Sequence, residues 1–270
     1  MPWPEQPISS WAHLGKIAGE IAAVGGSAAA YLCRGQADAG WGLTSSLVRL
    51  LPPGLARADA LATEKRAVER FKAQAHLHLP HSWRPPQSPP AGLADWWALI
   101  QHYSAPTRLL DWTYSLYAAA YFAVNSSWDR DGAIYLVHGG RLGTAMSERF
   151  GAKVRFADEE FVSDRPVARL APWTPARQTD RIVAQQSAFT VPLDVLADHG
   201  ALIEESLSPR GPDGAEINYH KLVVPARLKP PLMLQLRYMN IAAHSLFPGA
   251  DGVGRSVADV IRVGDPRARP

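Results

Sequence analysis

Residues 99–123 read LIQHYSAPTRLLDWTYSLYAAAYFA, and the character of the chain changes halfway along this stretch. Pro106 biases the residue before it away from helix and so predicts a turn. Residues 107–113 mix polar and apolar side chains and predict a short strand. Residues 116–123 are almost wholly apolar, which predicts a buried helix, and Ser115 is placed to cap its N-terminus.

Two charged residues, Arg108 and Asp111, lie in the predicted strand, and the chain that follows it is core. Charged side chains are seldom fully buried unless they are paired. Either the two residues form ion pairs, with each other or with Arg34 or Arg49, or they face a cleft. Because structural ion-pair networks resemble functional sites, the sequence leaves both interpretations open.

The rest of the chain alternates between helical and extended patterns. Apolar residues at helical spacing predict helices, and short apolar runs bounded by turn residues predict strands. The prolines of residues 79–92 exclude regular structure and predict a loop or flap. Helices are predicted over residues 10–24, 56–77, 93–100, 229–238 and 253–263, and strands over residues 28–36, 132–138, 153–156, 160–162, 181–191 (with a turn at Gln185–Gln186) and 221–224.

The composition indicates a globular protein. Of the 270 residues, 47% are hydrophobic and 20% are charged, which is enough to build a substantial core. No internal repeat or long linker divides the chain. We therefore expect a single α+β domain, in which residues 1–27 form an N-terminal helix and residues 28–263 form the core.

The net charge and the cysteine and histidine content limit the kinds of partner, bond and metal site that the protein can have. The net charge of +3 is mild and permits contact with nucleic acid without requiring it. The single Cys33 excludes an internal disulfide. The histidines are scattered, and the nearest group (His76, His78 and His81) falls at a predicted helix end, so no metal site is expected. No run of about 18 apolar residues and no signal-peptide pattern occurs, so we expect a cytoplasmic protein that does not contact membrane.

The triplet Arg34-Gly35-Gln36, residues 106–113 (PTRLLDWT) and several further short motifs together resemble the FRG domain family, which is named after an aromatic-Arg-Gly triplet. Cys33 stands where the triplet has its aromatic residue, and Tyr31 is only a near neighbour. The motifs lie between residue 31 and about residue 263, so the resemblance implies one FRG-type domain over nearly the whole chain. They are Arg34-Gly35-Gln36, Trp41 followed by Arg49, Gln101-His102-Tyr103, residues 106–113 (PTRLLDWT), Tyr121-Phe122-Ala123 and Leu246-Phe247-Pro248.

A second resemblance is to ADP-ribosyltransferases of the Arg-Ser-Glu class. That class has an early strand ending in Arg-Gly, then a strand with small hydroxyl residues that runs into a helix of A-x-x-F-A character, then a strand with an acidic residue. Residues 34–35, 113–123 and 181–189 follow in the same order. The resemblance implies an ADP-ribosyltransferase-like fold, with a mixed or antiparallel split sheet and flanking helices, and NAD as the substrate.

Roles in NAD binding follow from this resemblance. Arg34 would contact a phosphate or ribose through its planar guanidinium, and Arg108 would hold the second phosphate. Gly35 has no side chain, so its backbone could approach the nicotinamide amide closely. The expected NAD-binding residues are Arg34, Gly35, Gln36, Thr107 and Arg108, with Thr113 and Ser115 for the ribose and Tyr103, Trp112 and Tyr121 for stacking on the nicotinamide.

The chain departs from the class in its third motif, where Gln185 and Gln186 stand in place of a glutamate. Cleavage of the glycosidic bond of NAD develops positive charge on the ribose. A carboxylate about 4 Å away contributes roughly 4 kcal/mol at an effective dielectric constant near 20, about three decades in rate. Either Asp111 or Glu64 supplies this charge, or the protein binds without turnover. The candidate catalytic residues are Asp111, Arg34, Gln186 and His102, although His102 is better explained as a hydrogen-bonded structural histidine than as a general base.

Two functions are therefore expected from different classes. In the first, the protein transfers ADP-ribose from NAD to a nucleic-acid or protein acceptor, or hydrolyses NAD, and the family resemblance implies a toxin or phage-defence effector. In the second, it is a non-catalytic module that binds nucleic acid or a nucleotide through Arg34, Arg49 and Arg108.

Overall fold

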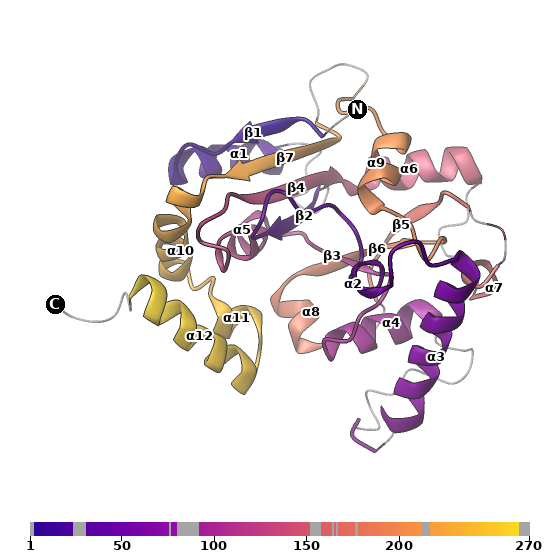
Figure 1. The fold of residues 1–270 in the computed structure, drawn as a ribbon. Helices are drawn as coiled ribbons and strands as arrows, with labels where there is room; N and C mark the ends of the chain where they lie inside the picture. The colour runs from indigo at the N-terminus through magenta and orange to yellow at the C-terminus, as the bar shows by residue number, and fades with distance from the viewer. Residues whose placement is uncertain are drawn as a thin grey trace.

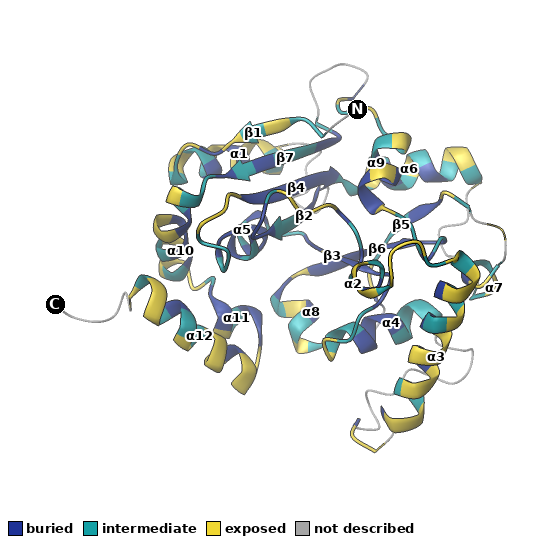
Figure 2. Cartoon of the chain, viewed as in Figure 1, coloured by how far each residue is buried: buried dark blue, intermediate teal, exposed yellow. Residues whose placement is uncertain are grey.

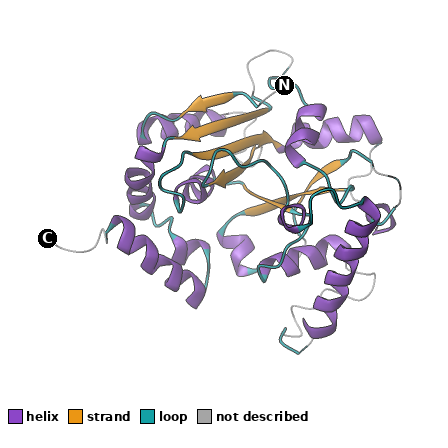
Figure 3. Cartoon of the chain, viewed as in Figure 1, coloured by secondary structure: helices purple, strands orange, loops and turns teal. Residues whose placement is uncertain are grey.

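A computed structural model describes residues 3–23, 31–75, 77–79, 92–151, 158–163, 165, 167–175, 178–211 and 217–264. One seven-stranded sheet runs through the molecule, with helices on both of its faces (Figures 1 and 3). The strands are β1 (Glu5–Pro7), β2 (Tyr31–Gln36), β3 (Leu110–Thr113), β4 (Gly132–His138), β5 (Leu170–Trp173), β6 (Ser187–Pro192) and β7 (Tyr219–Val224). The helices are α1 (Trp11–Ala23), α2 (Ser46–Leu50), α3 (Arg57–Ala75), α4 (Leu93–His102), α5 (Leu116–Val124), α6 (Gly139–Phe150), α7 (Asp158–Phe161), α8 (Asp180–Ala184), α9 (His199–Ser206), η4 (Ala226–Leu228), α10 (Lys229–Tyr238), α11 (Ala243–Leu246) and α12 (Ala250–Val263).

The strand order across the sheet is β1-β7-β4-β2-β3-β6-β5. Only β1 and β7 pair in parallel, and every other neighbouring pair is antiparallel. The sheet is therefore mixed, and the α+β class predicted from the sequence is confirmed.

The sheet is weakest between β2 and β3. These strands pair through one position, Cys33 opposite Thr113, whereas β2 pairs with β4 at six positions and β3 with β6 at four. Beyond that single pair the two strands share no ladder, so β1-β7-β4-β2 and β3-β6-β5 form two halves joined at one point. We call this junction the β2–β3 split.

Helices cover the two faces of the sheet unequally. On one face, α1, α5, α10 and α11 pack over the half that contains β2, and α3 and α4 pack near β6 in the other half. On the opposite face, α6 and α9 close a second core with β4 and β3. Figure 2 shows β4 and β6 as buried, while the outer sides of α3 and α12 are exposed.

The helix predicted from the quoted stretch forms as expected. Ser115 caps α5, because its side-chain oxygen accepts a hydrogen bond from the backbone N–H of Ala118. Nearly every residue of α5 is buried, which explains the unbroken apolar sequence. The helix predicted over residues 229–238 is α10, and its prolines stand in the first turn, where a missing N–H costs nothing.

One predicted strand is wrong, and another is correct only in its second half. Residues 160–162 belong to α7 and the turn after it, because three acidic residues in the first turn favour a helix N-terminus and Phe161 is buried. Residues 181–191 begin as α8, capped by Thr179, and become strand only at Ser187. The turn predicted at Gln185–Gln186 is present, and Gln186 has a φ of 48°. The strand predicted over residues 107–113 begins only at Leu110.

Other expectations fall on residues outside those described. The predicted strand over residues 153–156, most of the proline-rich segment 79–92, and His76 and His81 are of this kind. Among the helices of the described ranges, none has the length and apolar character needed to span a bilayer.

A chain of buried hydrogen bonds joins β3, β6 and α9. The indole N–H of Trp112 donates to Thr190 Oγ1 at 2.9 Å, and Thr190 Oγ1 lies 2.7 Å from Nδ1 of His199. Nε2 of His199 lies 3.2 Å from the carbonyl oxygen of Arg108. All four groups are satisfied when His199 is neutral, with Nε2 as donor and Nδ1 as acceptor. Complete burial lowers the pKa of His199 to about 3.

This pKa predicts a specific loss of stability in mild acid. Below its ordinary pKa of 6.5, His199 takes up a proton when the protein unfolds but not while it is folded. The free energy of unfolding should therefore fall by about 1.4 kcal/mol per pH unit as the pH drops below 6.5. Urea unfolding at a series of pH values measures how the free energy of unfolding depends on pH. In His199→Gln the slope of this dependence should be smaller by about 1.4 kcal/mol per pH unit. Equal slopes for the two proteins would contradict the assignment.

Gly35 predicts a second stability effect. A Cβ at this position would lie 1.8 Å from the carbonyl oxygen of Ala119, because α5 packs directly on β2. We expect Gly35→Ala to lower the free energy of unfolding by about 1–3 kcal/mol or more through overpacking. Gly42→Ala is the matched control, since nothing lies within 4 Å of a Cβ there. Denaturant unfolding that gives similar values for both variants would refute the close approach of α5.

Candidate functional site

Motif residues that the sequence singles out come together around Asp111 on β3. The end of α4 brings Gln101 and His102 to this point, and α8 with the turn after it brings Arg181 and Gln185. The remaining lining residues are Ala98, Ile182, Ser187 and Phe189. The site therefore lies on the face of β3 and β6 that α4 and α8 cover, beside the β2–β3 split.

Arg34 reaches Asp111 across the split. Its Nη1 donates to the backbone oxygen of Asp111 at 2.8 Å and lies 3.9 Å from the carboxylate oxygen Oδ2. The Asp111 side chain is 56% exposed, whereas that of Arg34 is 16% exposed. Burial lowers the pKa of Arg34, Asp111 opposes this effect, and the nearby charge of Arg49 adds to it. An exposed carboxylate thus stands beside a largely buried guanidinium.

Two buried polar atoms on β2 lack a hydrogen-bond partner among the described residues. They are Nε of Arg34 and Oε1 of Gln36, two positions apart on the same side of the strand. The amide of Gln36 donates through Nε2 to the carbonyl oxygen of Gly42 at 3.2 Å, so only its oxygen is unmatched. Buried polar atoms are rarely left unsatisfied, so these two are positions at which a ligand or water would gain a hydrogen bond.

His102 has a perturbed environment. Its Nδ1 lies 3.3 Å from Oγ1 of Thr179, and its backbone oxygen is 3.5 Å from a guanidinium nitrogen of Arg181. Burial lowers the pKa of His102, the charge of Arg181 lowers it further, and Asp180 opposes both. The imidazole is therefore neutral near pH 7.

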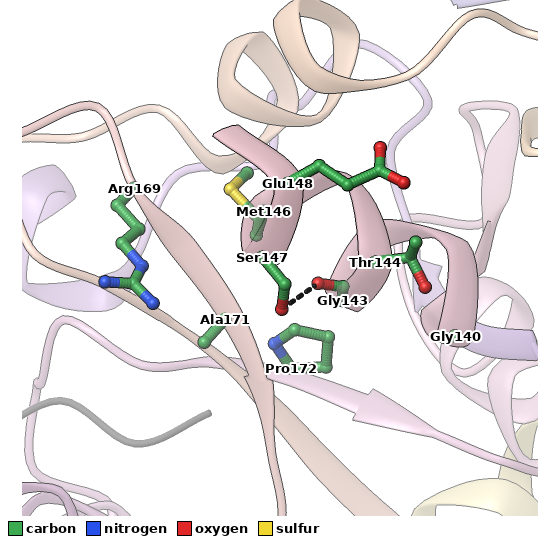
Figure 4. Close-up of a pocket in the computed structure, with 9 residues that line it drawn as sticks. All are labelled: Gly140, Gly143, Thr144, Met146, Ser147, Glu148, Arg169, Ala171 and Pro172. Carbon is green, nitrogen blue, oxygen red and sulfur yellow. Dashed lines mark hydrogen bonds between the residues drawn. The ribbon is translucent and has the colours of Figure 1, made fainter. Parts of the chain in front are cut away.

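The space beside Asp111 is small. Its volume is about 20 Å³, which accommodates roughly one water molecule. A larger pocket of about 500 Å³ lies between α6 and β5, and Figure 4 shows its lining from Gly140 to Glu148 together with Arg169, Ala171 and Pro172. None of the residues predicted from the sequence lines that pocket. A dinucleotide at the predicted residues would therefore lie along the surface, outside the small space beside Asp111.

Arg108 does not face a ligand site, contrary to one of the two interpretations left open. Its side chain is completely buried, and its guanidinium donates to both carboxylate oxygens of Glu64 and to the carbonyl oxygen of Leu193. The group also stacks 4.5 Å from the ring of Trp97. Arg108 is therefore a structural cation, and its partner is Glu64 rather than Asp111, Arg34 or Arg49. Glu64, bound in this pair, is not placed to act on a substrate.

Most of the other predicted NAD-binding residues have structural partners. Gly35 lies against α5, and Gln36 and Trp112 are buried. Thr107 is buried with its hydroxyl on Gln101, Thr113 is buried with its hydroxyl on the carbonyl oxygen of Gln185, and Tyr121 donates to Asp259. Ser115 is the N-cap of α5. Tyr103 and Gln186 are exposed, so with Arg34, Asp111 and His102 they remain candidates.

The sequence prediction did not include Arg181. Its residue type and its neighbours in the sequence do not indicate a functional role, because it enters the site only through the packing of α8 beside α4.

Among the described residues, no group of three or more His, Cys, Asp or Glu side chains is arranged to hold a metal ion.

Comparison with known proteins supports one of the two resemblances. A family model for the FRG domain matches residues 29–132, which confirms that resemblance over this part of the chain. The match contains Arg34, Gln101, Arg108 and Asp111, and it ends before Leu246-Phe247-Pro248. No curated protein and no solved structure matches the chain.

The buried pair of Arg108 and Glu64 predicts a large mutational effect. Glu64→Gln leaves the guanidinium buried without its counter-charge, so we expect a loss of about 3–5 kcal/mol in the free energy of unfolding. Glu69→Gln on the same helix breaks only the exposed contact with Lys72 and should cost about 1 kcal/mol or less. Chemical denaturation of both variants tests this, and a small effect at Glu64 would contradict the structural role of the pair.

Proposed function

We propose that this protein binds NAD at the β2–β3 split and transfers its ADP-ribose to a macromolecule or to water. The observation that carries the proposal is the contact of Arg34 with Asp111 at the point where β2 and β3 cease to pair. The three segments that resemble the ADP-ribosyltransferase pattern are also neighbours in space, since β2, β3 and β6 are consecutive strands. The family match alone does not indicate this activity.

Asp111 is the group best suited to stabilise the developing charge. Its carboxylate is exposed, whereas Glu64 is sealed in the core with Arg108. In the proposed reaction the carboxylate faces the ribose as its bond to nicotinamide lengthens and positive charge builds on the sugar. Arg34 holds the backbone of Asp111 through Nη1, which keeps a guanidinium group beside the carboxylate.

Gln186 occupies the position where the Arg-Ser-Glu class has its glutamate. The residue is exposed at the turn before β6, and its carbonyl oxygen accepts from the backbone N–H of Tyr114 at 3.0 Å. This bond fixes the turn beside β3. The side-chain amide can hydrogen-bond a ribose hydroxyl but brings no negative charge, so Asp111 has to supply it.

Asp111→Asn tests the proposal directly. Loss of the carboxylate should lower the rate of nicotinamide release from NAD by about a thousandfold, because roughly 4 kcal/mol of charge stabilisation disappears. The exposed position of Asp111 means that the melting temperature should change little. Asp129→Asn, which alters an exposed aspartate in the turn before β4, is the matched control and should retain the wild-type rate.

Two outcomes would overturn the proposal. One is the absence of NAD binding and of nicotinamide release from the wild-type protein, with or without cell lysate as a source of acceptor. The other is an Asp111→Asn variant as active as the control. Nucleic-acid affinity that falls steeply with salt in a protein that ignores NAD would favour the binding-module alternative.

A further inference from the structure

Two guanidinium groups lie over one aromatic ring next to the candidate site. That of Arg181, from the first turn of α8, is 4.8 Å from the centre of the Phe247 ring. That of Arg255, from α12, is 4.4 Å from the same centre. Arg181 also lines the space beside Asp111, so this cationic pair extends the site toward α12.

Most guanidinium nitrogens of this pair have no hydrogen-bond partner among the described residues. Arg181 makes no ion pair within 4.0 Å among the described residues, and its one hydrogen bond, to the carbonyl oxygen of His102, is long at 3.5 Å. Arg255 uses only Nε, which donates to Asp251 at 3.1 Å. Besides burial, the charge of Arg255 lowers the pKa of Arg181, while Asp111 and Asp251 oppose the shift. Two like charges held on one ring repel each other, and a bound anion would relieve that repulsion.

The Phe247 ring that both cations contact is held by packing on several sides. Phe247 is buried and packs edge-on against Phe122 at 6.0 Å. The backbone of α12 approaches closely enough that a Cβ on Gly252 would lie 1.8 Å from the carbonyl oxygen of Phe247. The side-chain amide of Gln185, a residue of the candidate site, donates to the carbonyl oxygen of Leu246 at 3.0 Å. The Leu246-Phe247-Pro248 motif therefore contacts both α12 and a residue of the candidate site.

We propose that Arg181 and Arg255 form an anion subsite that binds the pyrophosphate of the dinucleotide. Guanidinium groups present planar forks of N–H donors that match phosphate oxygens, and they are never deprotonated near neutral pH. That the ligand is NAD rests on the proposed function. The chemistry of the two guanidinium groups requires only a phosphate group. It places the phosphates outside the small space beside Asp111, toward solvent.

Calorimetric titration with two probes, inorganic pyrophosphate and NAD, tests the subsite. Arg255→Gln and Arg181→Lys should each weaken the binding of both probes by about tenfold or more, since each removes charge-assisted hydrogen bonds. Arg181→Lys keeps the positive charge and so isolates the contribution of the planar fork. Arg227→Gln removes an exposed arginine outside the site and should leave both affinities unchanged. Melting temperatures of all variants confirm that they fold.

The outcomes separate this inference from the proposed function. Pyrophosphate binding that weakens in both variants supports the subsite even if the protein proves inert toward NAD. NAD binding at wild-type strength in folded Arg255→Gln and Arg181→Lys would overturn the subsite and leave the proposed function standing. Failure of wild-type protein to bind pyrophosphate and NAD would overturn both.

Discussion

The guanidinium of Arg108 lies where four parts of the chain meet. Its partners are Glu64 on α3 and the carbonyl oxygen of Leu193 after β6, and its planar surfaces contact Trp97 on α4 and Phe161 on α7. Because a buried charge without partners is very costly, these elements have to be assembled around it together. The cation therefore fixes where β3 begins. β3 follows this cation directly in sequence and carries Asp111 of the candidate site.

The candidate site arises where the sheet is least regular. A complete ladder between β2 and β3 would place backbone partners along both strands, but the two strands pair only at Cys33 and Thr113. Beyond that point the side chain of Arg34, rather than the backbone of β2, donates a hydrogen bond to the backbone oxygen of Asp111. A charged side chain thus substitutes for a strand-to-strand hydrogen bond. This substitution leaves a carboxylate exposed beside a cation, which a regular sheet would not provide.

Some residues of the candidate site lie within the segment that matches the FRG family model, and others lie after it. Residues 29–132 supply β2, β3, α4 and α5, and with them the contact between Arg34 and Asp111. The other wall comes from later segments, with Arg181 on α8 and Phe247 and Arg255 at the C-terminal helices. In the proposed function, chemistry at Asp111 and recognition at Arg181 therefore belong to different stretches of sequence. Changes in the later segments would alter what binds without altering the carboxylate.

Local sequence patterns were sufficient to predict those helices and strands whose formation depends on burial and capping within a few residues. The apolar run with its Ser115 cap predicts α5, and the glycine-bounded apolar run of residues 132–138 predicts β4, because burial and capping act within a few residues. The short helices α7 and α8 were missed, since single turns are decided by what they pack against. The sequence also required partners for Arg108 and Asp111. Which partners they take, 44 and 77 residues away, was decided only by tertiary packing, because charge specifies the need for a counter-charge but not its position in the chain.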